Sequence, residues 1–146
     1  GVMGGKSQGQ LQVSDGISIF SGNISLANNG GFSSIYRVIE QLPQELDTIQ
    51  INVAGDGLAY QMRAVVYVNG YRLAYKHNFE TTKGQKSSVR FKLSDFIATF
   101  RGRVILDAPK LTSENITEVG FLVTSKQATA FSLSLFKVDI YQQLKV

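Results

Sequence analysis

The chain has 146 residues, an apolar fraction of 43% and a formal net charge of +4, and it contains no cysteine. That length and apolar content suit one globular domain with its own core, so residues 1–146 are expected to form a single domain. The missing cysteines exclude disulfide frameworks, thiolate metal sites and cysteine nucleophiles.

Apolar and polar residues alternate with period two along most of the chain, which indicates half-buried antiparallel strands. In chain order, the clearest runs lie at 17–26, 49–53, 60–68, 88–93 and 131–140. The parity of the apolar positions changes near Phe20 and again near Leu135, and each change predicts a bulge or bend.

Turn-forming residues separate these runs. Asn69-Gly70 predicts a type I′ hairpin, because both residues accept a positive φ. Ser94 could cap one short helix near 94–100 that carries Phe96 and Phe100. The regular spacing of short strands otherwise predicts an all-β fold, a two-sheet antiparallel β-sandwich.

Few residues could support catalysis. The only histidine, His77, shares one face of a predicted strand with Tyr75 and Phe79, where a structural role is more common than that of a base or metal ligand. The carboxylates are scattered over separate segments, and no glycine-rich loop leads into a helix. We therefore expect no enzyme activity, no metal site and no cofactor.

Basic residues are concentrated between Arg72 and Arg103, a stretch with eight basic and two acidic side chains. This imbalance suggests an acidic partner, although a solvated strand face is the simpler explanation. The aromatic rings interleaved there share faces with apolar residues, which disfavours nucleic-acid binding.

The expected compartment follows from what the chain lacks. No apolar run approaches the ~20 residues of a membrane helix, so a soluble, cytoplasmic protein is favoured. The compartment stays open, because the chain does not begin with Met and an upstream targeting segment could be missing.

Several segments, taken in order, resemble the complex I intermediate-associated protein family, whose members are assembly factors of respiratory NADH:ubiquinone oxidoreductase with many bacterial relatives. The resemblance rests on the glycine-rich opening at 1–9, the stretch 20–34, Gly55-Asp56-Gly57, the stretch 96–103 and the stretch 116–131. It covers nearly the whole chain and is that of a divergent, bacterial-type member. Tyr36 stands where the family often has arginine, and the chain has no tryptophan.

The resemblance implies a galactose-binding-like jelly-roll sandwich and a non-catalytic, chaperone-like module that binds a protein, such as a subunit of a respiratory complex. On this hypothesis a loop-built surface contacts the partner. The expected contact residues are Met3, Gly4, Gly5, Gly30, Gly31, Asp56, Tyr60 and Arg101.

A carbohydrate-binding module is the alternative, because this type of sandwich is widely used for sugar recognition. Sugar sites present exposed aromatic faces beside polar groups, and the candidate rings are Tyr36, Tyr67 and Tyr71. The fold by itself does not decide between the two functions.

Overall fold

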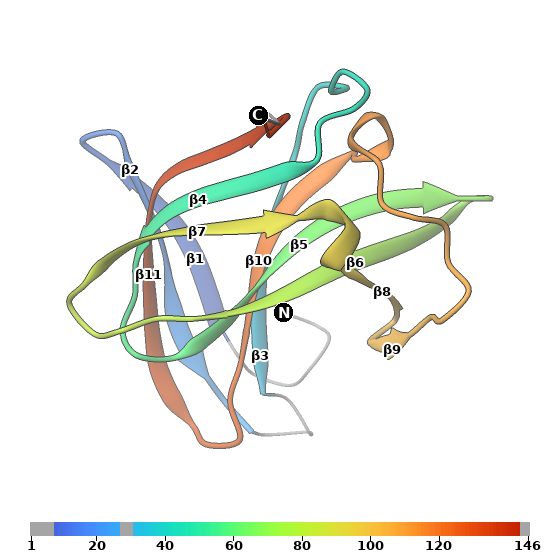
Figure 1. Cartoon of the computed structure of the whole chain (residues 1–146). Coiled ribbons are helices and arrows are strands. Elements are labelled where there is room, and N and C mark those ends of the chain that lie inside the picture. Colours follow the sequence, from blue (N-terminus) through green and yellow to red (C-terminus); the bar gives the residue numbers. More distant parts are fainter. Residues whose placement is uncertain (1–7, 27–30, 144–146) are drawn as a thin grey trace.

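The computed structural model describes residues 8–26 and 31–143, and these form two antiparallel β-sheets packed face to face (Figure 1). One sheet has five strands in the order β1-β2-β11-β4-β7, and the other has six in the order β3-β10-β5-β6-β8-β9. The expected two-sheet sandwich is confirmed. The strands are β1 (Gln8–Ser14), β2 (Ile17–Ile24), β3 (Phe32–Val38), β4 (Thr48–Ala54), β5 (Ala59–Val68), β6 (Tyr71–Glu80), β7 (Lys86–Lys92), β8 (Ile97–Phe100), β9 (Arg103–Val104), β10 (Glu118–Thr124) and β11 (Thr129–Tyr141).

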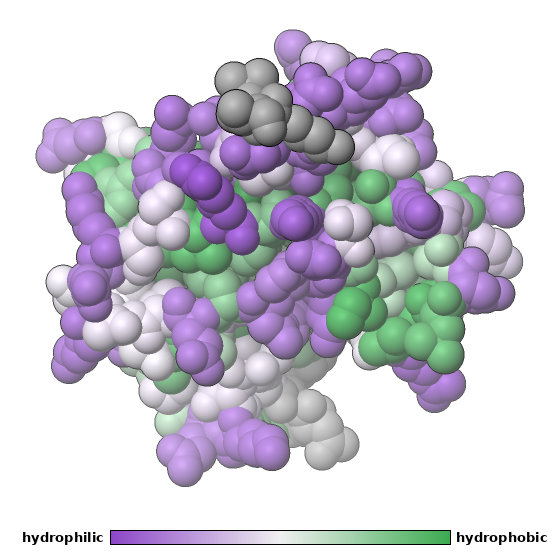
Figure 2. All heavy atoms as spheres, viewed as in Figure 1, coloured by the Kyte–Doolittle hydropathy of each residue, from purple (hydrophilic) through white to green (hydrophobic). Residues whose placement is uncertain are grey.

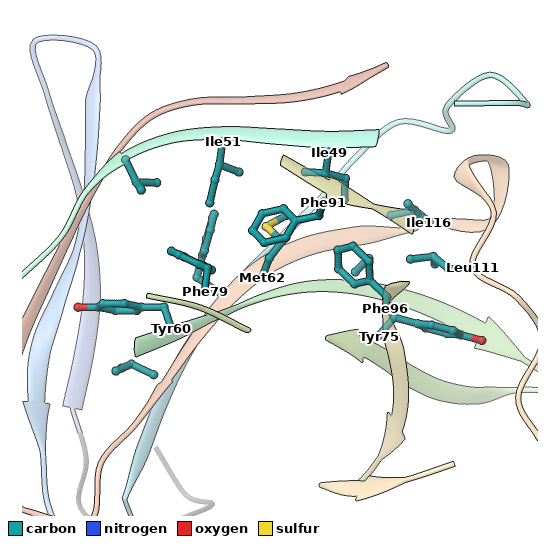
Figure 3. Close-up of a cluster of buried hydrophobic side chains, with 14 of the residues drawn as sticks. Ile49, Ile51, Tyr60, Met62, Tyr75, Phe79, Phe91, Phe96, Leu111 and Ile116 are labelled. Atoms are coloured by element: carbon teal, nitrogen blue, oxygen red, sulfur yellow. The ribbon is translucent and has the colours of Figure 1, made fainter. Parts of the chain in front are cut away.

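The core lies between the inner faces of the two sheets, and period-two alternation supplies it. Ile49 and Ile51 of β4 face Met62 of β5 across the interior (Figure 3). Phe91 of β7 is 1% exposed, and its ring centroid lies 5.8 Å from that of Phe79 on β6. The aromatic rings of the two sheets therefore interlock at the centre of the molecule.

One of the two predicted bulges is present. The pairing of β11 with β4 shifts register between Leu135 and Lys137, which confirms the bend expected there. The bulge expected near Phe20 is wrong, because β2 pairs with β1 and β11 without a register shift. Phe20 and Ile24 have the same parity and both point inward, whereas Ile19 lies on the other face and is only partly buried.

The helix expected near 94–100 is not formed. A single 3₁₀ turn covers Leu93–Asp95, closed by a hydrogen bond from Phe96 N to Leu93 O, and strand β8 follows at once. Pairing with β6 explains the difference: Thr99 opposes Ala74 and Ala98 opposes Tyr75. Tertiary strand pairing thus overrides a local pattern that suited a helix.

Turns connect the strands at both ends of the sandwich. Asn69 and Gly70 form the predicted hairpin between β5 and β6, with φ values of 50° and 83°. The β4–β5 turn around Asp56 lies at the opposite end of β5. Within the described ranges, no helix is long and apolar enough to cross a membrane.

Candidate functional site

The outer face of the six-stranded sheet carries long polar and aromatic side chains arranged in rows across the strands. In one row, here called the cationic row, Tyr36 on β3 opposes Gly120 on β10, which opposes Arg63 on β5. The row continues through Lys76 on β6 to Ile97 on β8. Four intervals at 4.7–4.9 Å each make the row about 19 Å long.

Gly120 explains how Tyr36 lies. A Cβ atom at position 120 would stand 2.5 Å from Cδ1 of Tyr36, so the ring runs close over the glycine backbone. The guanidinium carbon of Arg72 lies 4.6 Å from the centroid of the Tyr36 ring, a cation–π arrangement. Arg72 also pairs with Glu118 at 3.3 Å, and hydrogen bonding to that carboxylate helps raise the pKa of Arg72 against the opposing effect of burial.

Arg63 stands at the centre of the cationic row. Its Nε and one terminal nitrogen donate to Oε1 of Gln61 at 2.9 and 2.8 Å, and its other terminal nitrogen donates to the Tyr36 hydroxyl at 3.4 Å. Lys76 lies directly opposite on β6. Within residues 8–26 and 31–143, neither Arg63 nor Lys76 forms an ion pair.

A row of short side chains runs beside the cationic row. Val65, Ala74 and Thr99 also point outward, yet they are 0%, 7% and 2% exposed. This row of short side chains thus separates the cationic row from Tyr67 and Arg72.

Two of the three candidate sugar-binding tyrosines meet on this face. Tyr67 of β5 opposes Arg72 of β6 and is 52% exposed, so it flanks the Tyr36–Arg72 stack. Tyr71 instead begins β6 near the hairpin and packs edge-on against Phe100 at 5.5 Å.

Apolar side chains extend this face at its β8–β9 edge, where Figure 2 shows a green patch. Ile97, which opposes Lys76, is 49% exposed, and Val104 of β9 is 50% exposed. Leu106, two residues after β9, is 95% exposed. We call Ile97, Val104 and Leu106 the edge patch.

Asp56, a partly buried residue in the β4–β5 turn, accepts several hydrogen bonds. Its carboxylate accepts from the Tyr60 hydroxyl at 3.1 Å, from Leu58 N at 3.1 Å and from Ser132 N at 2.7 Å. Tyr60 is 1% exposed. Burial first, and then the charge of Asp56, raise the pKa of the Tyr60 hydroxyl well above its ordinary value.

The other residues expected to contact a partner are placed in separate regions. Gly31 (φ 137°) accepts a hydrogen bond from Ser125 N and lies beside the start of β3, at the same end of the sandwich as Asp56 and Tyr60. Arg101 stands in the β8–β9 turn toward the opposite end and covers the Phe100 ring at 5.0 Å. The expected contacts outside the described residues are Met3, Gly4, Gly5 and Gly30.

His77 points into the sandwich. Its ring lies 4.9 Å from that of Phe91 and 5.6 Å from that of Phe96, and its Nδ1 is 2.8 Å from Asn78 O. This packing agrees with the structural role expected for the residue. Among the described residues, no group of three or more histidine, cysteine or acidic side chains could hold a metal ion.

The residues at the centre of the outer face were not among those predicted from the sequence. Gln61 and Arg63 occupy the polar positions of the alternating run 60–68, and Lys76 occupies the corresponding phase of the next strand. Alternation alone could have assigned them to one face. The partners from β3 and β10 could not have been found, because sequence does not fix which strands are neighbours.

The architecture is that of galactose-binding-like β-sandwiches. Residues 1–135 match the family described as Complex I intermediate-associated protein 30 (CIA30), and the chain therefore belongs to that family. No curated protein matches the chain.

Solved structures with a similar fold include carbohydrate-binding modules. The family 11 module from Clostridium thermocellum, in complex with a β-1,3-1,4-mixed-linked tetrasaccharide, has a TM-score of 0.71 at 11% identity over 100% of this chain and 93% of that one. The family 11 module of the cellulosomal cellulase Lic26A-Cel5E from the same organism has a TM-score of 0.69 at 11% identity, over 98% and 86%.

The agarase AgWH50C has a TM-score of 0.62 at 10% identity, over 97% of this chain and 23% of that one. At such identities the likeness shows the fold alone.

Proposed function

We propose that this chain is a non-catalytic module that binds a protein partner, as an assembly-factor-like member of its family, and that it does so with the outer face of the six-stranded sheet. Residues 1–146 act as one domain in this proposal. The main support for this proposal is the amino-acid composition of that face. Tyrosine and arginine, the types enriched in interface hot spots, stand together at Tyr67 and Arg72.

The edge patch supports the same proposal, because exposed apolar side chains beside polar ones are typical of protein interfaces. It adjoins the cationic row through Ile97. The partner contacts expected at Gly31, Asp56 and Tyr60 stay a prediction. The bonds of Asp56 within the molecule favour a structural role for its carboxylate.

The experiment is affinity purification from the native organism with three baits: wild type, Leu106→Asp and Val13→Asp. Both changes add a carboxylate at an exposed apolar position, 95% exposed for Leu106 and 71% for Val13, which lies on β1 of the other sheet. The captured protein is then purified and titrated against each bait. We expect Leu106→Asp alone to lose binding. Equal binding by all three baits would refute the proposed surface.

Carbohydrate binding is the second candidate, favoured by the exposed ring of Tyr67 beside Arg72 on the outer face. The likeness to carbohydrate-binding modules adds support at the level of fold. Titration calorimetry with soluble polysaccharides tests it, with Tyr67→Ala as the variant expected to weaken binding. Tyr71→Ala is the matched control, because Tyr71 lies off the outer-face cluster.

A further inference from the structure

Two cations oppose each other on the outer face of the six-stranded sheet. Arg63 and Lys76 are directly paired across β5 and β6, and both are partly buried. Like charges placed directly opposite in a sheet destabilise it. Within the described part of the chain neither forms an ion pair, since the nearby Glu118 is engaged by Arg72.

The hydrogen bonds that Arg63 forms leave some of its N–H groups available to a ligand. A guanidinium has five N–H donors, and Gln61 and Tyr36 take three. One donor on each terminal nitrogen is left. The planar guanidinium suits the two oxygens of a carboxylate or sulfate group, and Lys76 adds a second positive charge next to it.

The surroundings of this pair suit a sugar more than an acidic peptide. Amide side chains oppose each other in the adjacent row, Gln61 on β5 and Asn78 on β6. Amides beside paired cations match the hydroxyl groups and the charge of an acidic sugar unit.

We propose that Arg63 and Lys76 form an anion-binding site for an acidic polysaccharide, one that carries carboxylate or sulfate groups, laid along the cationic row. This inference rests on the second candidate function, carbohydrate binding, and names its ligand class. The cationic row crosses five strands, so an extended chain of several sugar units has room along it.

The test uses affinity gel electrophoresis with two matched pairs of polymers. Polygalacturonate is compared with highly methyl-esterified pectin, which has a related backbone with its carboxylates masked, and dextran sulfate is compared with dextran. Poly-L-glutamate supplies carboxylates without sugar. The protein forms are wild type, Arg63→Gln/Lys76→Gln and the control Arg90→Gln/Lys92→Gln. The control removes the same two charges from exposed positions on β7 of the other sheet.

We expect at least one acidic polysaccharide to bind wild type and the control, and the neutral polymers not to bind. The Arg63→Gln/Lys76→Gln variant should bind at least about tenfold more weakly, as expected from the loss of a charge-assisted hydrogen bond. Salt should weaken the wild-type interaction.

Four results would overturn the inference. Equal binding of neutral polymers would remove the anion site and leave carbohydrate binding standing, whereas binding of no polysaccharide would remove both. Equal losses of binding in the two double variants would show that the polymer is attracted by the overall positive charge of the protein and not by this site. Equally tight binding of poly-L-glutamate would assign the site to an acidic protein segment.

Discussion

The hydroxyl of Tyr60 donates to the carboxylate of Asp56, with 3.1 Å to each of its oxygens. The same carboxylate accepts from Ser132 N at 2.7 Å. Tyr60 belongs to the six-stranded sheet and Ser132 to the five-stranded sheet. One turn residue therefore ties the two sheets together at one end of the sandwich.

Asp56→Ala should lower the free energy of unfolding by about 1–3 kcal/mol, because it leaves the buried Tyr60 hydroxyl without its acceptor. Asp56→Asn keeps one acceptor oxygen and should cost less than Asp56→Ala. Urea denaturation measures the free energy of unfolding of both variants, and their m-values should equal that of wild type. If Asp56→Ala were as stable as wild type, the carboxylate would have no structural role.

Alkaline pH should destabilise the protein partly through Tyr60. An unfolded tyrosine ionises near pH ~10. The folded protein keeps the proton to higher pH, because burial and the charge of Asp56 raise the pKa of this hydroxyl. This contribution to stability is complete below pH ~10 and is lost as the pH rises above it.

Tyr60→Phe removes that contribution, while Tyr75, whose pKa burial also raises, is present in both proteins. Above pH ~10, wild type should lose up to about 1.4 kcal/mol per pH unit more than Tyr60→Phe. Urea denaturation at several pH values between about pH 8 and 11 gives the slope of the free energy of unfolding against pH for each protein. Parallel slopes would contradict the burial of the Tyr60 hydroxyl next to the charge of Asp56.

The features of the fold that could be predicted from the sequence differ in physical origin from those that could not. Alternation identified the inner faces around Phe91 and Met62, because burial on one face of a strand leaves a period of two in the sequence. It could not decide that Ile97 begins a strand, since pairing with β6 outweighs the local helical spacing. The meeting of Tyr36 with Arg63 depends on β10 lying between β3 and β5, a long-range pairing with no local signal.

Phe91→Ala should destabilise the protein by about 3–5 kcal/mol, because it empties a central position against Phe79 and Phe96. Lys92→Ala, one residue further along β7, should change stability by less than about 0.5 kcal/mol, since Lys92 is exposed. Thermal and urea denaturation of the two variants check this difference. Equal effects of the two substitutions on stability would show that the buried and exposed faces of β7 are wrongly assigned.

Lys76→Glu should raise stability by about 0.2–1 kcal/mol, because it replaces a like-charge pair with an ion pair to Arg63. Lys92→Glu, on the other sheet, is the control for the change in net charge. A higher melting temperature for Lys76→Glu than for the control is the expected result. A lower one would show that Lys76 is already stabilised by a partner.

The outer face of the six-stranded sheet is the surface proposed to bind a partner. Photo-crosslinking in the native organism tests it most directly, with benzoylphenylalanine placed at position 78 or, as control, at position 92. Asn78 is exposed on that face beside Gln61, and Lys92 is exposed on the opposite sheet. Adducts of a defined partner or glycan are expected from position 78 and none from position 92. Adducts from position 92 alone would contradict it.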